Sequence, residues 1–207
     1  GLVPQSEILN ILLKLPAESR CRLRPGSVAL LGILLCAPAV TCAEPDTGHA
    51  GMVEAAAEFS GRLRTALQSA MRAGGPVAAI EVCHQQAPAI ATAVGAERGL
   101  LVRRTGVRLR NPHNVADPMD QQLMEDFARQ MAEGADPATL AVLSSTPDGR
   151  LRYTRAIPVE AVCLACHGEA IAPDLSDAIK AHYPDDRATG FQPGQLRGLL
   201  VVETLNP

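Results

Sequence analysis

The segment Cys163-Leu164-Ala165-Cys166-His167 constrains the fold more than any other part of the sequence. Two thiols three residues apart on one helical turn can form thioether bonds with the two vinyl groups of a haem, and the adjacent histidine can then bind the iron. The motif therefore predicts one covalently bound haem c, with Cys163 and Cys166 as attachment points and His167 as an axial ligand. With 2 Tyr, 3 Phe and no Trp, the core must come from Ala, Val, Leu and Ile, and a bulky prosthetic group could fill it.

Two other interpretations of the motif compete with haem attachment. One is a redox-active or disulfide-forming cysteine pair, and the other is half of a zinc site. Zinc usually takes four ligands, and a second cysteine pair is absent, although Cys83 and His84 could supply two ligands. A thioredoxin-like pair normally begins a helix after a buried strand, which Ile157-Pro158-Val159-Glu160 matches poorly. We therefore favour the haem attachment site.

An export signal is indicated near the N-terminus. Three arginines precede an apolar run over 27–40, and small residues follow up to Ala43, a pattern that predicts cleavage after Ala43 and a periplasmic location. The run is about 14 residues long, short of the roughly 20 that cross a bilayer, so we expect no stable membrane span after cleavage. A lipid anchor at Cys42 is a weaker alternative. The expected organisation is a leader over 1–43, with residues 1–19 set aside as an over-extended start, and a haem domain over 44–207.

Charge and cysteine content narrow the function further. The sequence has 19 Lys and Arg against 22 Asp and Glu, so it lacks the excess of positive charge that is typical of nucleic-acid-binding domains. Of its 6 cysteines, those before residue 43 would leave with the leader, so that Cys83, Cys163 and Cys166 remain. An odd cysteine in an oxidising compartment needs a role, as a free thiol, an intermolecular disulfide or a ligand.

The pattern of apolar residues predicts a mixed α+β chain. Amphipathic spacing favours helices over 52–72, 77–94 and 117–132, with Gly74-Gly75-Pro76 ending the first and Pro88 kinking or ending the second. Strands are expected over 100–109, 139–144, 151–157 and 199–204, with a hairpin turn at Pro147-Asp148-Gly149 and a loop over 111–114.

Several side chains are candidates for the second axial position of the iron. They are Cys83, His84, His113, His182, Met52, Met71, Met119, Met124 and Met131. Cys83 stands apart, because it is the leftover thiol, lies on the apolar side of a predicted helix and would give ferric iron a strong thiolate donor. A buried, inert cysteine remains equally open. His84 points roughly 100° away from Cys83 around a regular helix, so the two side chains cannot both meet the iron.

Four arginines in the predicted strand and the loop after it are the remaining candidates: Arg103, Arg104, Arg108 and Arg110. Such residues usually form a solvated face. The functional alternative is that Arg104 and Arg110 contact the propionates of a haem.

Four ordered segments resemble the motifs of a known family. They are Cys83 to Ala91, Arg104-Thr105 with Arg110 to Asn114, Cys163 to Gly168, and Tyr183 to Phe191 with Gly194 and Arg197-Gly198. Together they are similar to the Tll-type single-haem domain, a c-type haem domain that occurs alone in a cyanobacterial cytochrome and as the periplasmic sensing part of histidine kinases.

The resemblance covers roughly Gly51 to Thr204. It implies a PAS-like fold in which helices flank an antiparallel sheet, and axial ligation of the haem by His167 and Cys83. Sensor-kinase members continue into a transmitter, whereas this sequence ends at Pro207, so we do not expect this polypeptide to signal directly.

The expected function is that of a periplasmic mono-haem cytochrome. With both axial positions filled by protein, oxygen or peroxide binds only by displacing a ligand, which argues against peroxidase, reductase or oxygenase activity. A thiolate favours ferric iron and hence a low potential. We expect low-potential electron transfer or redox sensing with an unidentified redox partner protein, and a homodimer is compatible with the sequence. The alternative is a sensor of NO or CO that binds where Cys83 leaves the iron.

Overall fold

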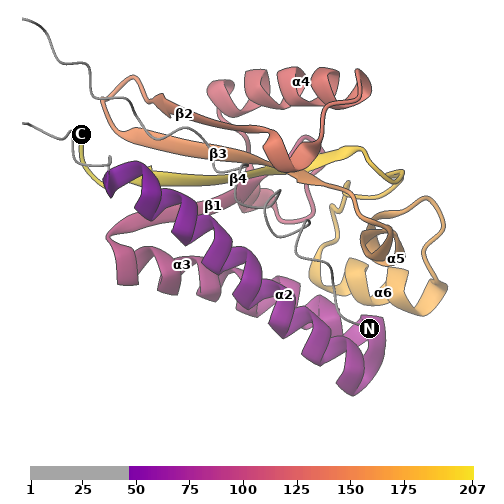
Figure 1. Ribbon diagram of the computed structural model, residues 1–207. Helices are drawn as coiled ribbons and strands as arrows, with labels where there is room; N and C mark the ends of the chain where they lie inside the picture. Colours follow the sequence, from indigo (N-terminus) through magenta and orange to yellow (C-terminus); the bar gives the residue numbers. More distant parts are fainter. Residues whose placement is uncertain (1–46) are drawn as a thin grey trace, which may run out of the picture. The chain divides into compact units, whose positions relative to one another are not determined.

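The computed structural model describes residues 47–207. The predicted leader over 1–43 and its cleavage point lie outside the described residues and stay predictions. Among the helices that the structure describes, none combines the length and the apolar character needed to span a membrane. The described part is an α+β unit in which helices flank a four-stranded antiparallel sheet (Figure 1), so the predicted fold class is confirmed.

The first helical region consists of α2 (Thr47–Glu81), the π-helical turn η1 (Val82–Gln86) and α3 (Ala87–Arg98). The predicted break within it is confirmed, because Gly74 and Gly75 leave the helical conformation and Gly75 has a φ of 71°. Only glycine takes up such a positive φ without strain. Pro76 then begins the second helical stretch, where its missing N–H costs no hydrogen bond.

The sheet has the strand order β1-β4-β3-β2, and every neighbouring pair is antiparallel. Its strands are β1 (Leu100–Thr105), β2 (Ala141–Ser145), β3 (Leu151–Pro158) and β4 (Leu196–Thr204). The predicted hairpin is thus confirmed as β2 and β3, and the closing strand starts three residues earlier than expected. The predicted strand over 100–109 is too long, since it stops at Thr105, the last residue that pairs with β4. At Gly106 the chain passes so close to Arg197 that a Cβ would lie 2.9 Å from its carbonyl oxygen.

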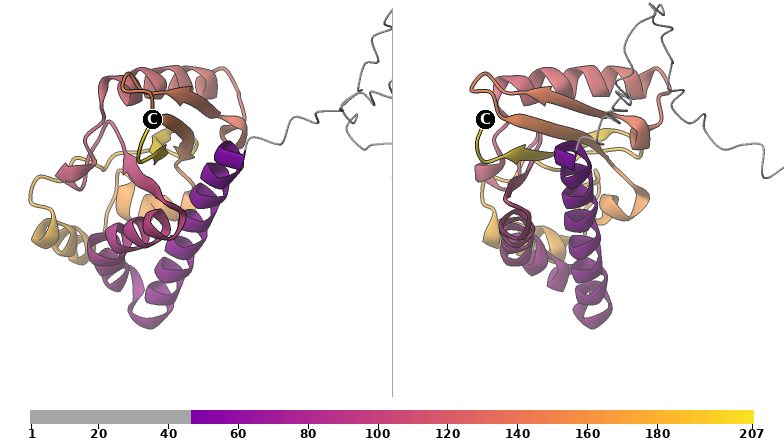
Figure 2. Two further views of the ribbon diagram at one scale, coloured as in Figure 1. Left: turned by 90° about the vertical axis from the view of Figure 1, so that its left-hand side faces the viewer. Right: turned by 60° about the vertical axis from the view of Figure 1, so that its left-hand side comes forward.

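Helices cover both faces of the sheet (Figure 2), and each face carries its own hydrophobic core. On one face, α2 and α3 pack on Val102, Leu200 and Val202. On the other face, α4 (Pro118–Ala132) packs on Leu199 and Val201. Successive side chains of a strand point to opposite faces, and both faces of β4 are covered. The strand is therefore apolar at every position from Leu199 to Val202. All four of these residues are buried, at 2% exposure or less.

The helix over 117–132 starts as predicted. The Asp117 side chain accepts a hydrogen bond from the backbone N–H of Asp120, the Asp120 side chain accepts one from the N–H of Asp117, and Pro118 occupies the first turn. This reciprocal arrangement satisfies two N–H groups that a helix start leaves without partners.

Short elements complete the unit. They are the 3-10 turns η2 (Pro112–Asn114), η3 (Pro137–Thr139) and η4 (Ala161–Cys163), and the helices α5 (Leu164–His167) and α6 (Pro173–His182). The helix α6 was not predicted. Its Leu175 and Ile179 pack against Ile80, near the end of α2, and so fix where the segment around α5 lies.

Candidate haem-binding site

The Cys-x-x-Cys-His segment forms a tight helical turn. Cys163 ends η4 and is followed directly by α5, whose last residue is His167. The N–H of Gly168 donates to the carbonyl oxygen of Leu164 at 2.8 Å, and a Cβ at Gly168 would lie 2.5 Å from that oxygen. Glycine therefore lets the chain leave the turn directly after the histidine. Both cysteines are free thiols and half-buried, as a haem attachment turn requires.

His167 is held in one tautomer by the segment that follows α6. Its Nδ1 lies 2.7 Å from the carbonyl oxygen of Ala188. A carbonyl only accepts, so Nδ1 carries the proton and Nε2 keeps a free lone pair. Burial lowers the pKa of His167 from 6.5 to about 3, and the positive charges of Arg197 and Arg110 add to this effect. The ring is therefore a neutral donor at neutral pH, which is the form that binds metals.

Two further hydrogen bonds join the same segments. The N–H of Phe191 donates to the carbonyl oxygen of His167 at 2.9 Å, and the N–H of Gly190 donates to that of Gly168 at 2.9 Å. The Phe191 ring stands edge-on to the His167 ring, with 6.3 Å between their centroids. The residues from 188 to 191 thus hold the histidine ring from one side.

Cys83 lies in the π-helical turn between α2 and α3. The N–H of Ala87 donates to the carbonyl oxygen of Val82, five residues earlier, instead of the usual four. Pro88 follows at once and has no N–H to continue the regular pattern, so the helix changes its winding at this point instead of ending as we had allowed. Turns of this kind are frequent at functional sites, since they change the direction of a side chain within a helix.

The segment that carries Cys83 lies near Cys166, because Cys166 packs against the cluster that includes Ile80, three residues before Cys83. Burial raises the pKa of the Cys166 thiol, and the Cys83 and Cys163 thiols contribute to the rise. Cys166 also contacts the small core that Ile80 and Tyr183 form between α2 and α6. Segments 80 residues apart in the sequence therefore place three thiols and one neutral imidazole in one region.

His84 is exposed and lies at the edge of this region. Its ring lies 4.8 Å from the ring of His182 and 5.4 Å from that of Tyr183. Among the described residues, no group of three or more His, Cys, Asp or Glu side chains could hold a bare metal ion. The zinc interpretation, which needed Cys83 and His84 together with the motif, therefore finds no support in this arrangement.

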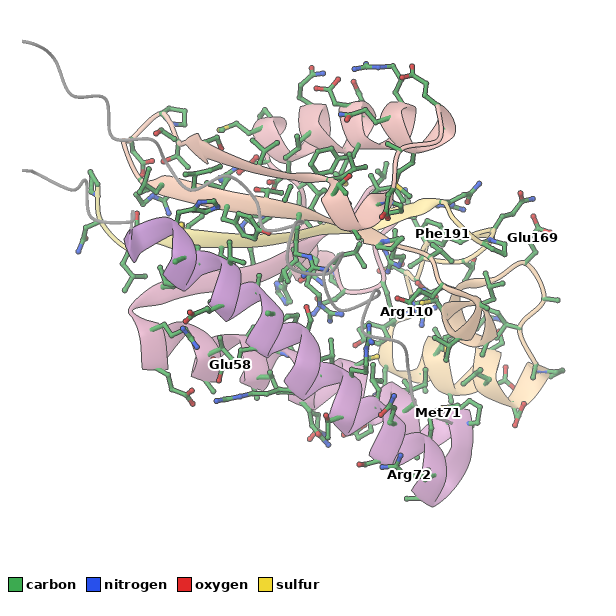
Figure 3. The ribbon with its side chains drawn as sticks, in the orientation of Figure 1. Glu58, Met71, Arg72, Arg110, Glu169 and Phe191 are labelled. Atoms are coloured by element: carbon green, nitrogen blue, oxygen red, sulfur yellow. The ribbon has the colours of Figure 1, made fainter. Side chains whose placement is uncertain are left out.

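Arg110 joins the haem motif to the segment after α6. Its Nη2 donates to the carbonyl oxygen of Cys166 at 2.6 Å and to Asp186 at 3.0 Å, while its buried Nε has no partner in the described part of the chain. Figure 3 shows Arg110 and Phe191 at the same end of the sheet, beside α5. The carboxylate of Asp186 also accepts from the N–H of Ala188, the residue that orients His167.

Arg104 and Arg197 bring further positive charge to this region. Arg104 stands over the Phe59 ring at 5.6 Å and is close enough to Cys83 for their charges to interact. Burial lowers the pKa of Arg104, and burial together with Arg110 and Arg104 lowers that of Arg197 to about 10. Arg104 forms no ion pair with any other described residue. Asp186 is the carboxylate that pairs with Arg110 and lies near Arg197, and Arg104 has no such partner among the described residues.

The other two arginines of the predicted set have structural partners. Arg103 points to the opposite face of the sheet and pairs with Asp120 at 2.6 Å. Arg108 donates to the carbonyl oxygens of Thr189 and Gly190 and stacks on Phe191 at 3.5 Å. Neither is a solvated side chain, and only Arg104 and Arg110 of the four remain near the thiols.

A known protein family matches this chain in sequence. The Tll0287-like family model matches residues 44–204, most of the sequence. The chain belongs to the Tll0287-like family. Among solved structures it is similar to the crystal structure of the cyanobacterial heme-protein Tll0287, with a TM-score of 0.58 and 28% sequence identity over 76% of this chain and 95% of that one. No curated protein sequence matches it. The predicted resemblance is thus confirmed.

In this Tll0287-like chain, the residues fit a haem. The fit rests on the free Nε2 of a neutral His167, on the unpartnered Nε of Arg110, and on positive charge that exceeds the negative charge nearby. A haem would supply iron to Nε2 of His167 and two propionate carboxylates to the arginines. A redox-active disulfide alone would supply no carboxylates for Arg104, Arg110 and Arg197.

Sequence reasoning assigned no role to Asp186, Ala188 or Arg197 of this Tll0287-like site. Ala188 acts through its backbone carbonyl, which no side-chain pattern reveals. Arg197 precedes Gly198 in β4, where a Cβ on residue 198 would lie 2.0 Å from the carbonyl oxygen of Thr105. An arginine beside an obligatory glycine near the start of a buried strand was the signal available.

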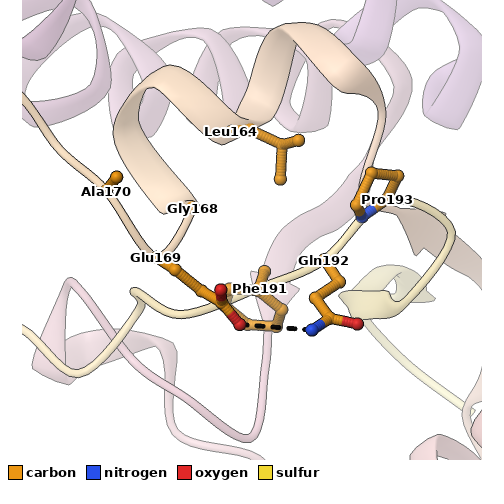
Figure 4. A pocket seen from close by; sticks show the side chains of 7 residues that line it. All are labelled: Leu164, Gly168, Glu169, Ala170, Phe191, Gln192 and Pro193. Atoms are coloured by element: carbon orange, nitrogen blue, oxygen red, sulfur yellow. Dashed lines mark hydrogen bonds between the residues drawn. The ribbon is translucent and has the colours of Figure 1, made fainter.

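A shallow cavity of about 270 Å³ borders the outer side of α5 in the Tll0287-like unit (Figure 4). It is lined by Leu164, Gly168, Glu169, Ala170, Phe191, Gln192 and Pro193, and Gln192 donates to Glu169 at 3.2 Å across it. Its lining contains neither the thiols nor His167. We therefore place the candidate haem site on the other side of the turn, where Cys83 and Cys166 lie.

Proposed function

We propose that this chain binds one haem c covalently and acts as a periplasmic redox protein. In this proposal Cys163 and Cys166 form the two thioether bonds, His167 binds the iron through Nε2, and Cys83 takes the second axial position. The observation that carries the proposal is the convergence of the Cys83 turn on the Cys-x-x-Cys-His turn. The matched structure is that of a heme-protein, which supports it.

The bound haem would supply one-electron chemistry at the iron. The chain's own part is to hold the two ligands and to offset charge. Hydrogen bonding of Nδ1 to Ala188 keeps the imidazole oriented and raises its basicity, as partners beyond the metal ligand generally do. Arg104 and Arg110, with Arg197 beside them, would pair with the propionates, because guanidinium groups bind carboxylates through two parallel hydrogen bonds.

Low-potential electron transfer or redox sensing is the function that this ligand set favours. A thiolate stabilises ferric iron, and two protein ligands leave no open coordination position for oxygen or peroxide. We accordingly propose no enzymatic activity, and a redox partner protein as the natural counterpart. Export to the periplasm, predicted from the leader, places the chain where c-type attachment takes place.

Replacement of Cys83 tests the ligand set. The Cys83→Ala variant should keep its covalent haem but change from a low-spin to a high-spin ferric spectrum, since one strong ligand is lost. The matched control is His84→Ala, which alters the neighbouring exposed side chain and should leave the spectrum unchanged. An unchanged ferric spectrum in Cys83→Ala would show that another group binds the iron.

A further inference from the structure

The strand β2 lies at one edge of the sheet, where β3 is its only partner among the described strands (Figure 1). An edge strand has a row of N–H and C=O groups that point away from the sheet, and native proteins usually protect such an edge with charged residues, a proline or a bulge. The residues of β2, Ala141 to Ser145, include no charge and no proline, and their register with β3 is regular. This edge therefore lacks the usual protection against pairing with another strand.

The hydrogen bonds at the two ends of the β2–β3 hairpin show which backbone groups point outward. The N–H of Ala156 donates to the carbonyl oxygen of Leu140, and the N–H of Thr146 donates to that of Arg150. Both pairs continue the register of the hairpin, and hydrogen-bonded pairs alternate along an antiparallel ladder. Counted from Leu140, every second residue thus turns its backbone groups toward β3, and the residues between them turn theirs to the open edge.

Ala141, Leu143 and Ser145 are the residues whose backbone groups point to the open edge. All three are exposed, and their N–H and C=O groups have no hydrogen-bond partner among the described residues. They are spaced evenly about Leu143, which makes the edge complementary to itself. When a second β2 runs antiparallel with Leu143 opposite its own copy, every outward N–H meets an outward C=O.

The side chains of β2 also fit a second copy of the chain. Val142 is 37% exposed and Leu143 is 38% exposed, on opposite faces of the strand. In the register centred on Leu143, the two leucine side chains pack against each other, and no charge in β2 opposes the pairing. The other edge strand, β1, carries Arg103 and Arg104, so pairing of two β1 strands would bring like charges together.

We propose that β2 is a homodimer interface, through which two copies of this chain join their sheets by antiparallel pairing about a two-fold axis at Leu143. The same residues serve both copies, as in most two-fold dimers. Because only five residues of each copy pair, the interface is small and belongs to the weak, reversible class. The inference goes beyond the proposed haem chemistry and does not depend on it.

Sedimentation equilibrium of the full chain over about 1 to 300 μM measures the association, since a weak dimer forms in this range. The average mass should rise from that of one chain toward that of two. Hydrogen exchange at the two ends of the range gives a second readout. The backbone N–H of Leu143 should exchange several-fold more slowly at the high concentration, because it then donates to the second copy.

Substitution of residue 143 tests the register. Leu143→Lys and Leu143→Glu each place two like charges opposite each other and should weaken association at least about tenfold. An equimolar mixture of the two variants should restore association, since unlike charges then meet, and this rescue also shows that both variants fold. Leu101→Lys is the matched control and should leave the association unchanged, because Leu101 is 41% exposed on the other edge strand, β1.

Three results would overturn the proposal. The first is a protein that keeps the mass of a single chain at every concentration, and the second is a Leu143→Lys variant that associates as tightly as the unaltered protein. The third is a mixture of Leu143→Lys and Leu143→Glu that associates no more tightly than either variant alone, because residue 143 then does not face its own copy.

Discussion

Nδ1 of His167 donates a hydrogen bond of 2.7 Å to the carbonyl oxygen of Ala188, 21 residues further along the chain. This bond fixes the tautomer of the only histidine in the Cys-x-x-Cys-His motif. The same backbone segment is tied to Arg110 through Asp186. The orientation of the proposed iron ligand thus depends on a loop, and not on the motif alone.

The first prediction concerns pH and the haem-free protein. The pKa of His167 is lowered from 6.5 to about 3 by burial and by Arg197 and Arg110. Folding then favours the neutral ring, so its contribution to stability is complete above pH 6.5 and is lost as the pH falls toward 3. Over that window the free energy of unfolding should fall by about 1.4 kcal/mol per pH unit from this group.

Urea unfolding of haem-free protein at several pH values measures this slope. The His167→Gln variant is the control, because it lacks the titrating ring and should show a shallower dependence. Titration of the His167 ring near 6.5, observed by NMR, would contradict the proposed burial of a neutral imidazole.

The second prediction is that the effect of Arg104→Met on the unfolding midpoint changes sign when haem is bound. In haem-free protein the half-buried charge of Arg104 has no carboxylate partner among the described residues, so Arg104→Met should raise the unfolding midpoint. In haem-loaded protein the same variant should lower the midpoint, because a propionate loses its partner. It should also lower the reduction potential, since removal of a nearby positive charge favours ferric iron. Thermal unfolding of both forms and a redox titration provide the readouts.

Arg108→Met is the matched control for Arg104. Arg108 donates to the backbone of Thr189 and Gly190, so its loss should destabilise both forms alike. If Arg104→Met lowers the midpoint equally with and without haem, Arg104 has a structural role only and the assignment to a propionate is wrong.

The third prediction concerns Gly198, where β4 passes β1. Because a Cβ there would lie 2.0 Å from the carbonyl oxygen of Thr105, Gly198→Ala must push the strands apart. We expect a loss of about 3 kcal/mol, typical of overpacking. Gly61→Ala, at an exposed position of α2 with open space around it, should instead add about 0.5 to 1 kcal/mol. Equal urea midpoints for the two variants would show that the approach of the strands is not tight.

The fourth prediction concerns the buried charge network on the α4 face. The Glu203 side chain is 3% exposed and accepts from Arg103, Arg150 and Arg152 at 3.1, 2.7 and 2.9 Å. Glu203→Gln should cost about 3 to 5 kcal/mol, because it leaves a buried positive charge uncompensated. The control Glu97→Gln removes an exposed partner of Arg62 and should have no measurable effect on urea unfolding. A small loss in Glu203→Gln would mean that water reaches the network.

Local signals in the sequence were sufficient to predict much of the fold. The Asp117-Pro118 helix start, the Pro147-Asp148-Gly149 turn and the glycine break after residue 73 each depend on residues within one turn of the chain. These are the features that backbone preference and capping determine. The hairpin of β2 and β3 also followed from two short segments around that turn, whereas the complete antiparallel sheet was implied only by the family resemblance.

The parts that sequence did not reveal depend on contacts between distant segments. The helix α6 has only two buried apolar residues, Leu175 and Ile179, too few for a clear periodic pattern. The π-helical turn at Cys83 resembles a regular helix in its apolar spacing, and Pro88 alone did not distinguish a change of winding from an end. The roles of Arg103 and Arg108 were assigned only once their carboxylate and carbonyl partners were known.

The absorption spectrum of the protein co-expressed with a cytochrome c maturation system tests the central claim most directly. We predict one covalent haem per chain in the pyridine haemochrome assay, a low-spin ferric spectrum, and no covalent haem in Cys163→Ala/Cys166→Ala. Carbon monoxide added to the reduced protein should leave the spectrum unchanged if electron transfer is the function, whereas an immediate shift would favour gas sensing. Absence of covalent haem from the unaltered chain under these conditions would contradict the account and leave Cys83, Cys163 and Cys166 as thiols without a haem.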